Sequence, residues 1–196
     1  MKPEERTQSL VKADIYRILS KGFTYPDIDV IEDIGSIANE LLDFPHLDRF
    51  FYGYIKEILP LLNTDDIRRE YSRLFLKGTV PLCESSYNLS FDVIPRLSAF
   101  YSAFGLSPRS GESPDSISYE LEFASFLSLK RALAECPEDR EVVEEAYRSF
   151  LKEHLSGFVD GFFKRVKHMG PCPFYRVMVE FLKEFVGREL IEGGGG

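Results

Sequence analysis

The helical character of this chain is clearest in residues 47–62, LDRFFYGYIKEILPLL. The apolar side chains in this stretch recur at intervals of three and four residues, which is the period of one face of an α-helix. The same spacing returns at residues 155–166 and again at 174–185. We therefore expect an all-α protein, with its core formed by the apolar faces of such helices.

Working outward, local start and stop signals predict further helices. Pro3 and two glutamates open one and Gly22 ends it, and Thr64 or Asp65 could cap another. The predicted ranges are 4–21, 27–43, 66–76, 94–104 and 117–133. Alternating strand patterns are nearly absent, and residues 78–87, GTVPLCESSY, are expected to form a loop because they contain Pro81 and a polar cluster.

A second loop, residues 105–116 with the sequence GLSPRSGESPDS, interrupts the helical pattern. Loops of this length are uncommon inside a compact domain and often have a function or act as a hinge. We predict a single helical domain of about nine helices arranged in two sub-bundles. The parts are expected at 1–104, at 105–116 as the hinge loop, at 117–192, and at 193–196 as a disordered tail.

Composition excludes several classes of protein. The 196 residues include 44% hydrophobic and 29% charged residues and carry a formal net charge of −8, whereas a nucleic-acid-binding domain needs a basic surface. We find no apolar run long enough to span a membrane and no signal peptide. Three widely spaced cysteines are typical of reduced thiols. These observations predict a cytoplasmic protein that neither inserts into a membrane nor binds nucleic acid.

The chain offers little support for catalysis or for a cofactor. His46, His154 and His168 lack the spacing of metal ligands and are interpreted as surface or capping residues. There is no phosphate-binding loop and no serine nucleophile elbow. Glu120 and Glu122 point to different sides of one helix, so they do not form an acid–base pair. We expect no catalytic residues, no metal and no cofactor.

Two segments remain as candidates for binding a cationic, apolar peptide. The first comprises residues 70–75 and the loop 81–87, where Glu84 could pair with a basic group, although Tyr71 and Leu74 could simply be core residues. The second is the start of the helix 117–133. There Asp115 could be either an N-cap or a ligand, and Glu120 could either bind a ligand or complement the helix dipole.

Four stretches together resemble the TorD/DmsD/NarJ family of redox-enzyme maturation chaperones. They are IYRILSKGFTYPD at 15–27, YSRLFLKG at 71–78 with PLCESSY at 81–87, SPDSISYELEF at 113–123, and FLKEHLSGFVDGFF at 150–163 with the FYRVMVEFLKEF that follows. The sequence departs from the family pattern at Ser113, where the family has Glu, and at Ser116, where it has His. Glu112 could substitute for the missing glutamate after a shift of one residue.

The resemblance implies an all-helical, non-enzymatic protein that binds the twin-arginine signal peptide, or another segment, of a molybdenum-cofactor oxidoreductase. Such a chaperone holds the catalytic subunit until its cofactor is inserted. The implied peptide-binding positions are Leu74, Phe75, Pro81, Glu84, Ser85, Tyr87, Asp115, Ser116 and Glu120. The protein is expected as a monomer or a domain-swapped dimer. Two alternatives stay open, a small cofactor-dependent enzyme or regulator and a structural adaptor for a folded partner.

Overall fold

The computed structural model describes residues 3–44, 47–88, 90–107, 111 and 113–193. Within these ranges the fold is all-α, without strands apart from one isolated β-bridge, as the helical periodicity predicts. The α-helices are α1 (Pro3–Gly22), α2 (Ile28–Leu42), α3 (Arg49–Ile58), α4 (Thr64–Tyr71), α5 (Val93–Ala103), α6 (Ile117–Leu133), α7 (Pro137–Phe150), α8 (Ser156–His168) and α9 (Pro173–Gly193). No described helix is long and apolar enough to cross a bilayer.

Four short helical segments join or extend these helices. Two are 3₁₀ turns, η1 (Leu59–Leu61) and η3 (Glu84–Ser86). The other two are π-helical, with η2 (Ser72–Leu76) continuing α4 and η4 (Leu151–Leu155) linking α7 to α8. Single π-helical turns often mark functional sites because they change the direction of side chains within a continuous helix. Both π-helical turns contribute residues to the site described below.

Side-chain caps set the start of several helices. Asp27 accepts a hydrogen bond from Val30 N at 2.9 Å at the start of α2. Helix α4 is capped by Asn63, whose Oδ1 accepts from Asp66 N at 3.0 Å, so the expectation of Thr64 or Asp65 was wrong by one residue. Asn63 is extended, which lets its side chain turn back onto the free N–H groups of the first helical turn.

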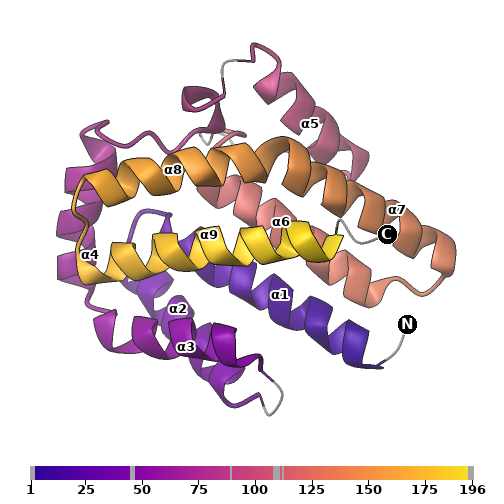
Figure 1. The fold of residues 1–196 in the computed structure, drawn as a ribbon, viewed down its shortest axis with the longest axis horizontal. Coiled ribbons are helices and arrows are strands. Elements are labelled where there is room, and N and C mark those ends of the chain that lie inside the picture. Colours follow the sequence, from indigo (N-terminus) through magenta and orange to yellow (C-terminus); the bar gives the residue numbers. More distant parts are fainter. Residues whose placement is uncertain (1–2, 45–46, 89, 108–110, 112, 194–196) are drawn as a thin grey trace.

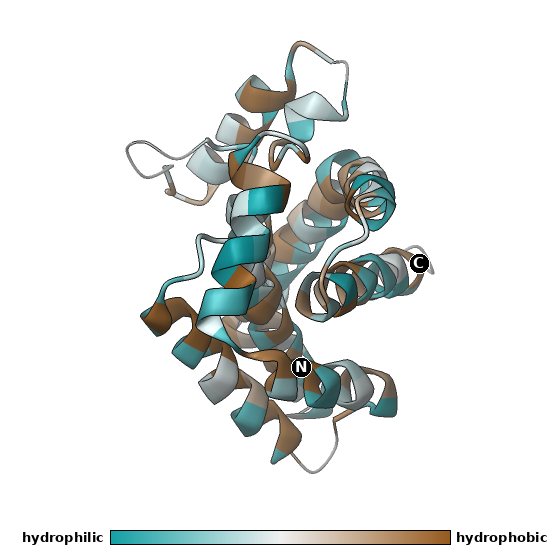
Figure 2. Cartoon of the chain, turned by 90° about the vertical axis from the view of Figure 1, so that its left-hand side faces the viewer, coloured by the Kyte–Doolittle hydropathy of each residue, from teal (hydrophilic) through white to brown (hydrophobic). Residues whose placement is uncertain are grey.

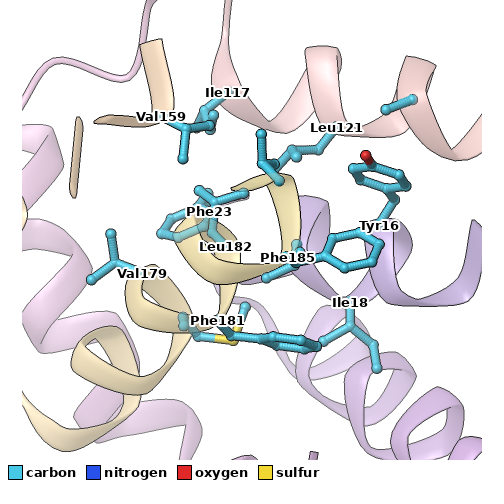
Figure 3. Close-up of a cluster of buried hydrophobic side chains, with 14 of the residues drawn as sticks. Tyr16, Ile18, Phe23, Ile117, Leu121, Val159, Val179, Phe181, Leu182 and Phe185 are labelled. Carbon is cyan, nitrogen blue, oxygen red and sulfur yellow. The ribbon is translucent and has the colours of Figure 1, made fainter. Parts of the chain in front are cut away.

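The helices pack around one hydrophobic core rather than around two. Helix α1 lies along α6, α8 lies along α9, and α2 and α3 cover the side nearer α1 and α9 (Figure 1). Ribbon colours in Figure 2 alternate along each helix between hydrophilic and hydrophobic residues, as expected for amphipathic helices. Tyr16 of α1 meets Phe185 of α9 with ring centroids 4.7 Å apart (Figure 3). Phe23 meets Phe162 of α8 at 5.1 Å.

Side chains that precede and follow the loop 105–116 therefore share one core, and the prediction of a single domain is confirmed. That the loop 105–116 acts as a hinge stays a prediction. Residues 108–110 and 112 of this loop, Glu112 included, lie outside the described residues, as does His46. Helix α9 extends through Gly193, and residues 194–196 of the expected tail are also outside the described ranges.

A buried polar cluster ties α1, α7 and α9 together; we call it the Glu189 cluster. Glu189 is 2% exposed, and its Oε1 lies 2.8 Å from Lys12 Nζ. Tyr147 donates a hydrogen bond to Glu189 Oε2 at 2.7 Å, and its hydroxyl lies 2.9 Å from that of Tyr16. Glu189 therefore accepts a hydrogen bond at Oε2 and forms an ion pair with Lys12 at Oε1. Such a buried carboxylate acts as a structural link between helices.

Candidate functional site

Two loops that are far apart in the sequence lie side by side at the start of α6. Cys83 and Ser116 form an antiparallel bridge. Glu84 N donates to Asp115 O at 2.8 Å, and Ile117 N donates to Leu82 O at 2.8 Å. The structure therefore brings together the two segments that the sequence analysis selected separately. We refer to residues 81–87 and 113–116 as the paired loops.

Asp115 holds the paired loops together. Its side chain is buried, and its carboxylate accepts hydrogen bonds from Ser85 N at 3.1 Å and from the hydroxyl of Ser113. Burial raises the pKa of this carboxyl, but the hydrogen bonds from Ser113 and Ser85 outweigh burial, so the pKa lies below its usual value. Asp115 thus stays ionised where it is partly shielded from solvent.

The expectation that Asp115 caps the helix 117–133 was wrong. Ser116 is the N-cap of α6, and its hydroxyl accepts from Tyr119 N at 3.3 Å. The side chain of Asp115 instead turns to the backbone of the neighbouring loop. Ser116 caps the helix because it is the extended residue directly before the first turn of α6, where its hydroxyl reaches the free N–H groups.

Glu84 forms a buried pair with His154. His154 Nδ1 lies 2.8 Å from Glu84 Oε2, and the two side chains are 2% and 1% exposed. Asn88 donates to the other oxygen of Glu84 at 3.0 Å. The interpretation of His154 as a surface or capping residue was therefore wrong, whereas His168 is exposed as expected.

The π-helical turn η4 places His154 at this position, between the rings of Phe100 and Phe150. The centroids of both rings lie 5.5 Å from that of the imidazole. His154 is 70 residues from Glu84 in the chain, so no local spacing could reveal the pair. The only signal in the sequence was a histidine at a position where the helical pattern expects an apolar residue, since Leu151 and Leu155 flank it.

Glu120 is the least satisfied polar group of the site. Its side chain is 0% exposed, and neither carboxyl oxygen has a hydrogen-bond partner in the part of the chain that the structure describes. Burial raises the pKa of this carboxyl well above its usual value, and the neighbouring Glu84 and Asp115 raise it further. Glu122, by contrast, is exposed, so the two glutamates do point to different sides of α6.

The remaining predicted residues form the wall around these groups. Leu74 and Phe75 are buried in the core, with Phe75 stacked on Phe162 at 6.1 Å. Tyr87 is half-buried and donates from its hydroxyl to Pro81 O at 2.8 Å. Its ring packs against α8, where a Cβ at Gly161 would lie 2.8 Å from Tyr87 Cδ1. Ser85 is exposed, whereas Pro81 and Ser116 are partly exposed.

Glu84, Asp115, Glu120 and His154 together make up a buried group that we call the carboxylate cluster. It contains three carboxyls and one imidazole. Within the described residues no set of three or more His, Cys, Asp or Glu side chains is arranged to hold a metal ion. The three cysteines are free thiols. The arrangement is therefore suited to pairing with a cation that brings its own hydrogen-bond donors.

Apolar side chains are exposed on the segments that lead into and out of the cluster. Leu76, at the end of η2, is 62% exposed, and Phe91 and Ile94, which follow the loop 81–87, are 104% and 44% exposed. The buried Leu74 and Phe75 directly precede Leu76 in the chain. These exposed side chains, which flank the loop 81–87 in the sequence, offer an extended ligand apolar surface to contact.

Comparison with known proteins places this site in a family. The model of the nitrate reductase delta subunit family matches residues 47–164, which include every member of the carboxylate cluster. The chain belongs to the nitrate reductase delta subunit family. This confirms the resemblance to the TorD/DmsD/NarJ chaperones.

A curated relative agrees with the family assignment. The chain is similar to a perchlorate reductase assembly chaperone protein of Dechloromonas aromatica (strain RCB). The two are 25% identical over 210 residues, which cover 96% of this chain and 92% of that protein. The alignment therefore extends well beyond the family match, across nearly the full length of both proteins.

Proposed function

We propose that this protein is a non-catalytic, cytoplasmic assembly chaperone that binds the twin-arginine signal peptide, or another basic and apolar segment, of a molybdenum-cofactor oxidoreductase subunit. Family membership and the curated assembly chaperone support the general role. The observation that supports a basic ligand is the carboxylate cluster, where three carboxyls are gathered beside a single imidazole.

The chemistry of the ligand matches the two parts of the site. A twin-arginine leader combines two guanidinium groups with an apolar stretch. Guanidinium groups pair with carboxylates through two parallel hydrogen bonds, and the exposed Leu76, Phe91 and Ile94 can contact the apolar stretch. Micromolar affinity requires a net free energy of about 8 kcal/mol, which a few apolar anchors and one or two ion pairs can supply.

The proposal is tested by titrating the purified protein with a fluorescent leader peptide of a molybdoenzyme. We expect saturable binding that is lost when the two arginines of the peptide are replaced by glutamine. A protein that binds neither the leader nor the mature subunit would refute the proposal.

Matched surface variants test the apolar part of the site. Leu76→Ser and Phe91→Ser should weaken binding on the order of tenfold each, because each removes an exposed apolar side chain from a segment that flanks the loop 81–87. Ile191→Ser changes a comparably exposed side chain near the end of α9, and it should leave binding unchanged. Equal effects of all three variants would indicate a general loss of structure and not a lost contact.

A further inference from the structure

Glu120 is fully buried, and its carboxyl has no hydrogen-bond partner among the residues that the structure describes. The titratable groups that face it in this part of the chain are Cys83 and Glu84 from the loop 81–87, Asp115 from the segment 113–116, and Tyr101 from α5. None of these supplies a positive charge.

The other side chains of the cluster each have a partner, although His154 Nε2 has none among the described residues. His154 pairs with Glu84, Asp115 accepts from the backbone of Ser85, and Tyr101 donates to Pro114 O at 2.7 Å. An ionised carboxylate without a partner is costly to bury, so the folded protein keeps the Glu120 carboxyl protonated. A protonated, unpartnered acid beside two carboxylates is a vacant position for a cation.

The paired loops adjoin this position. They are joined by the hydrogen bonds of Ile117 N to Leu82 O, of Glu84 N to Asp115 O and of Ser85 N to Asp115. Surface loops open at a lower free energy than a packed core does, and Ser85 and Ser86 of the loop 81–87 are exposed. Separation of the paired loops would give a ligand access to Glu120. It would also move Tyr87, whose ring lies 5.3 Å from that of Phe158 in α8.

We propose that Glu120 is the ion-pair partner of a guanidinium group of the bound peptide, that the group reaches it when the paired loops separate, and that each binding event releases one proton. This inference rests on the proposed function. In the step the O–H bond of the carboxyl breaks, the proton passes to solvent, and the resulting carboxylate pairs with the guanidinium, which keeps its own protons. Affinity for the peptide should therefore rise by up to about tenfold per pH unit while Glu120 is protonated in the free protein.

Isothermal titration calorimetry of the full chain measures the released proton directly. The probe is a synthetic peptide with two consecutive arginines followed by apolar residues, titrated at one pH in phosphate and in Tris, whose ionisation enthalpies differ. We expect about one proton released per peptide bound by the wild type and by Glu122→Gln, which removes an exposed carboxyl from the same helix. Glu120→Gln should release none and should bind on the order of tenfold more weakly.

Carbon NMR of labelled glutamate side chains provides a readout that needs no ligand, with Glu120→Gln identifying the signal. A Glu120 carboxyl that is protonated in the free protein at neutral pH supports the inference, and an ionised one overturns it. Peptide binding without proton release also overturns it, while leaving the proposed function intact. If no arginine-containing peptide binds, the proposed function fails and with it the assignment of the guanidinium, whereas the NMR spectrum still decides the state of Glu120.

Discussion

Two of the buried glutamates, Glu189 on α9 and Glu120 on α6, differ in how their carboxyls are partnered. Glu189 pairs with Lys12 and accepts from Tyr147, so its charge is compensated. Glu120 is equally buried but has no partner among the described residues. A compensated carboxylate links helices, whereas an uncompensated one lowers stability unless a ligand completes it. The contrast separates a structural cluster from a candidate binding cluster within one small domain.

The largest effect is expected from breaking the compensated cluster. Glu189→Ala leaves Lys12 without its buried partner and Tyr147 without an acceptor. We expect a loss of about 3 kcal/mol in the free energy of unfolding, because unpaired buried polar groups remain. This corresponds to a fall of roughly 6–12 °C in Tm by circular dichroism. Glu192→Ala removes the exposed partner of Lys12 and should cost less than about 1 kcal/mol; an equal effect would contradict the assignment.

The Glu84–His154 pair should respond almost as strongly. His154→Gln leaves the buried Glu84 carboxyl without its imidazole partner, and Glu84→Gln leaves the buried imidazole without its carboxyl partner. We expect each variant to lower the free energy of unfolding by about 2–3 kcal/mol. The double variant should cost less than the sum, since neither original partner remains. Chemical denaturation of all four proteins gives the coupling free energy. A coupling near zero would show that the two groups act independently.

A smaller effect is expected at the paired loops. Asp115→Ala removes the acceptor for Ser85 N and for the Ser113 hydroxyl, which should cost about 1–2 kcal/mol. Ser113→Ala removes one of these contacts and should cost less. Peptide titration of the same variants separates two roles. If Asp115→Ala loses stability but keeps its affinity, Asp115 holds the loops and does not bind the ligand.

The substitution Glu120→Gln should change the free energy of unfolding least at low pH, and its effect should grow as the pH rises. The folded state holds the proton of Glu120 above the pH at which the unfolded chain, with an ordinary glutamate pKa of about 4.3, has released it. Wild-type stability therefore falls as pH increases through this window, and Glu120→Gln removes that loss. The variant should gain relative to wild type by up to about 1.4 kcal/mol per pH unit above pH 4.3. Denaturant titrations at several pH values check the slope, and Glu122→Gln should show none of it.

The sequence was sufficient for the fold class, and it selected two segments that the structure brings together, whereas their role in binding a peptide stays a prediction. Helical spacing in 47–62, 155–166 and 174–185 predicts helices that the structure contains, because local periodicity determines which face a helix buries. The sequence also selected the segments of Glu84 and Asp115 as separate candidates, and the structure shows that they are neighbours. The sequence did not predict that both are buried, since burial depends on which distant segment packs against a loop.

His154 shows most clearly why the rest could not be predicted. Its partner Glu84 is 70 residues away, and a π-helical turn aims the imidazole inward, whereas regular helical spacing gives no such direction. The contact between Tyr16 and Phe185 joins the two ends of the chain. Helical spacing predicts that both side chains are buried but does not specify that they meet, because that depends on how distant helices pack.

The single core affects when the protein can fold during its synthesis. Helix α1 leaves the ribosome first, yet its aromatic residues pack against α8 and α9, which are translated last. Glu84 is likewise translated before its partner His154, so the cluster is incomplete until η4 has been made. A nascent chain that stops before α9 would thus expose an unfinished apolar surface and lack part of its core. Only the fully translated chain therefore has the complete core that supports the carboxylate cluster.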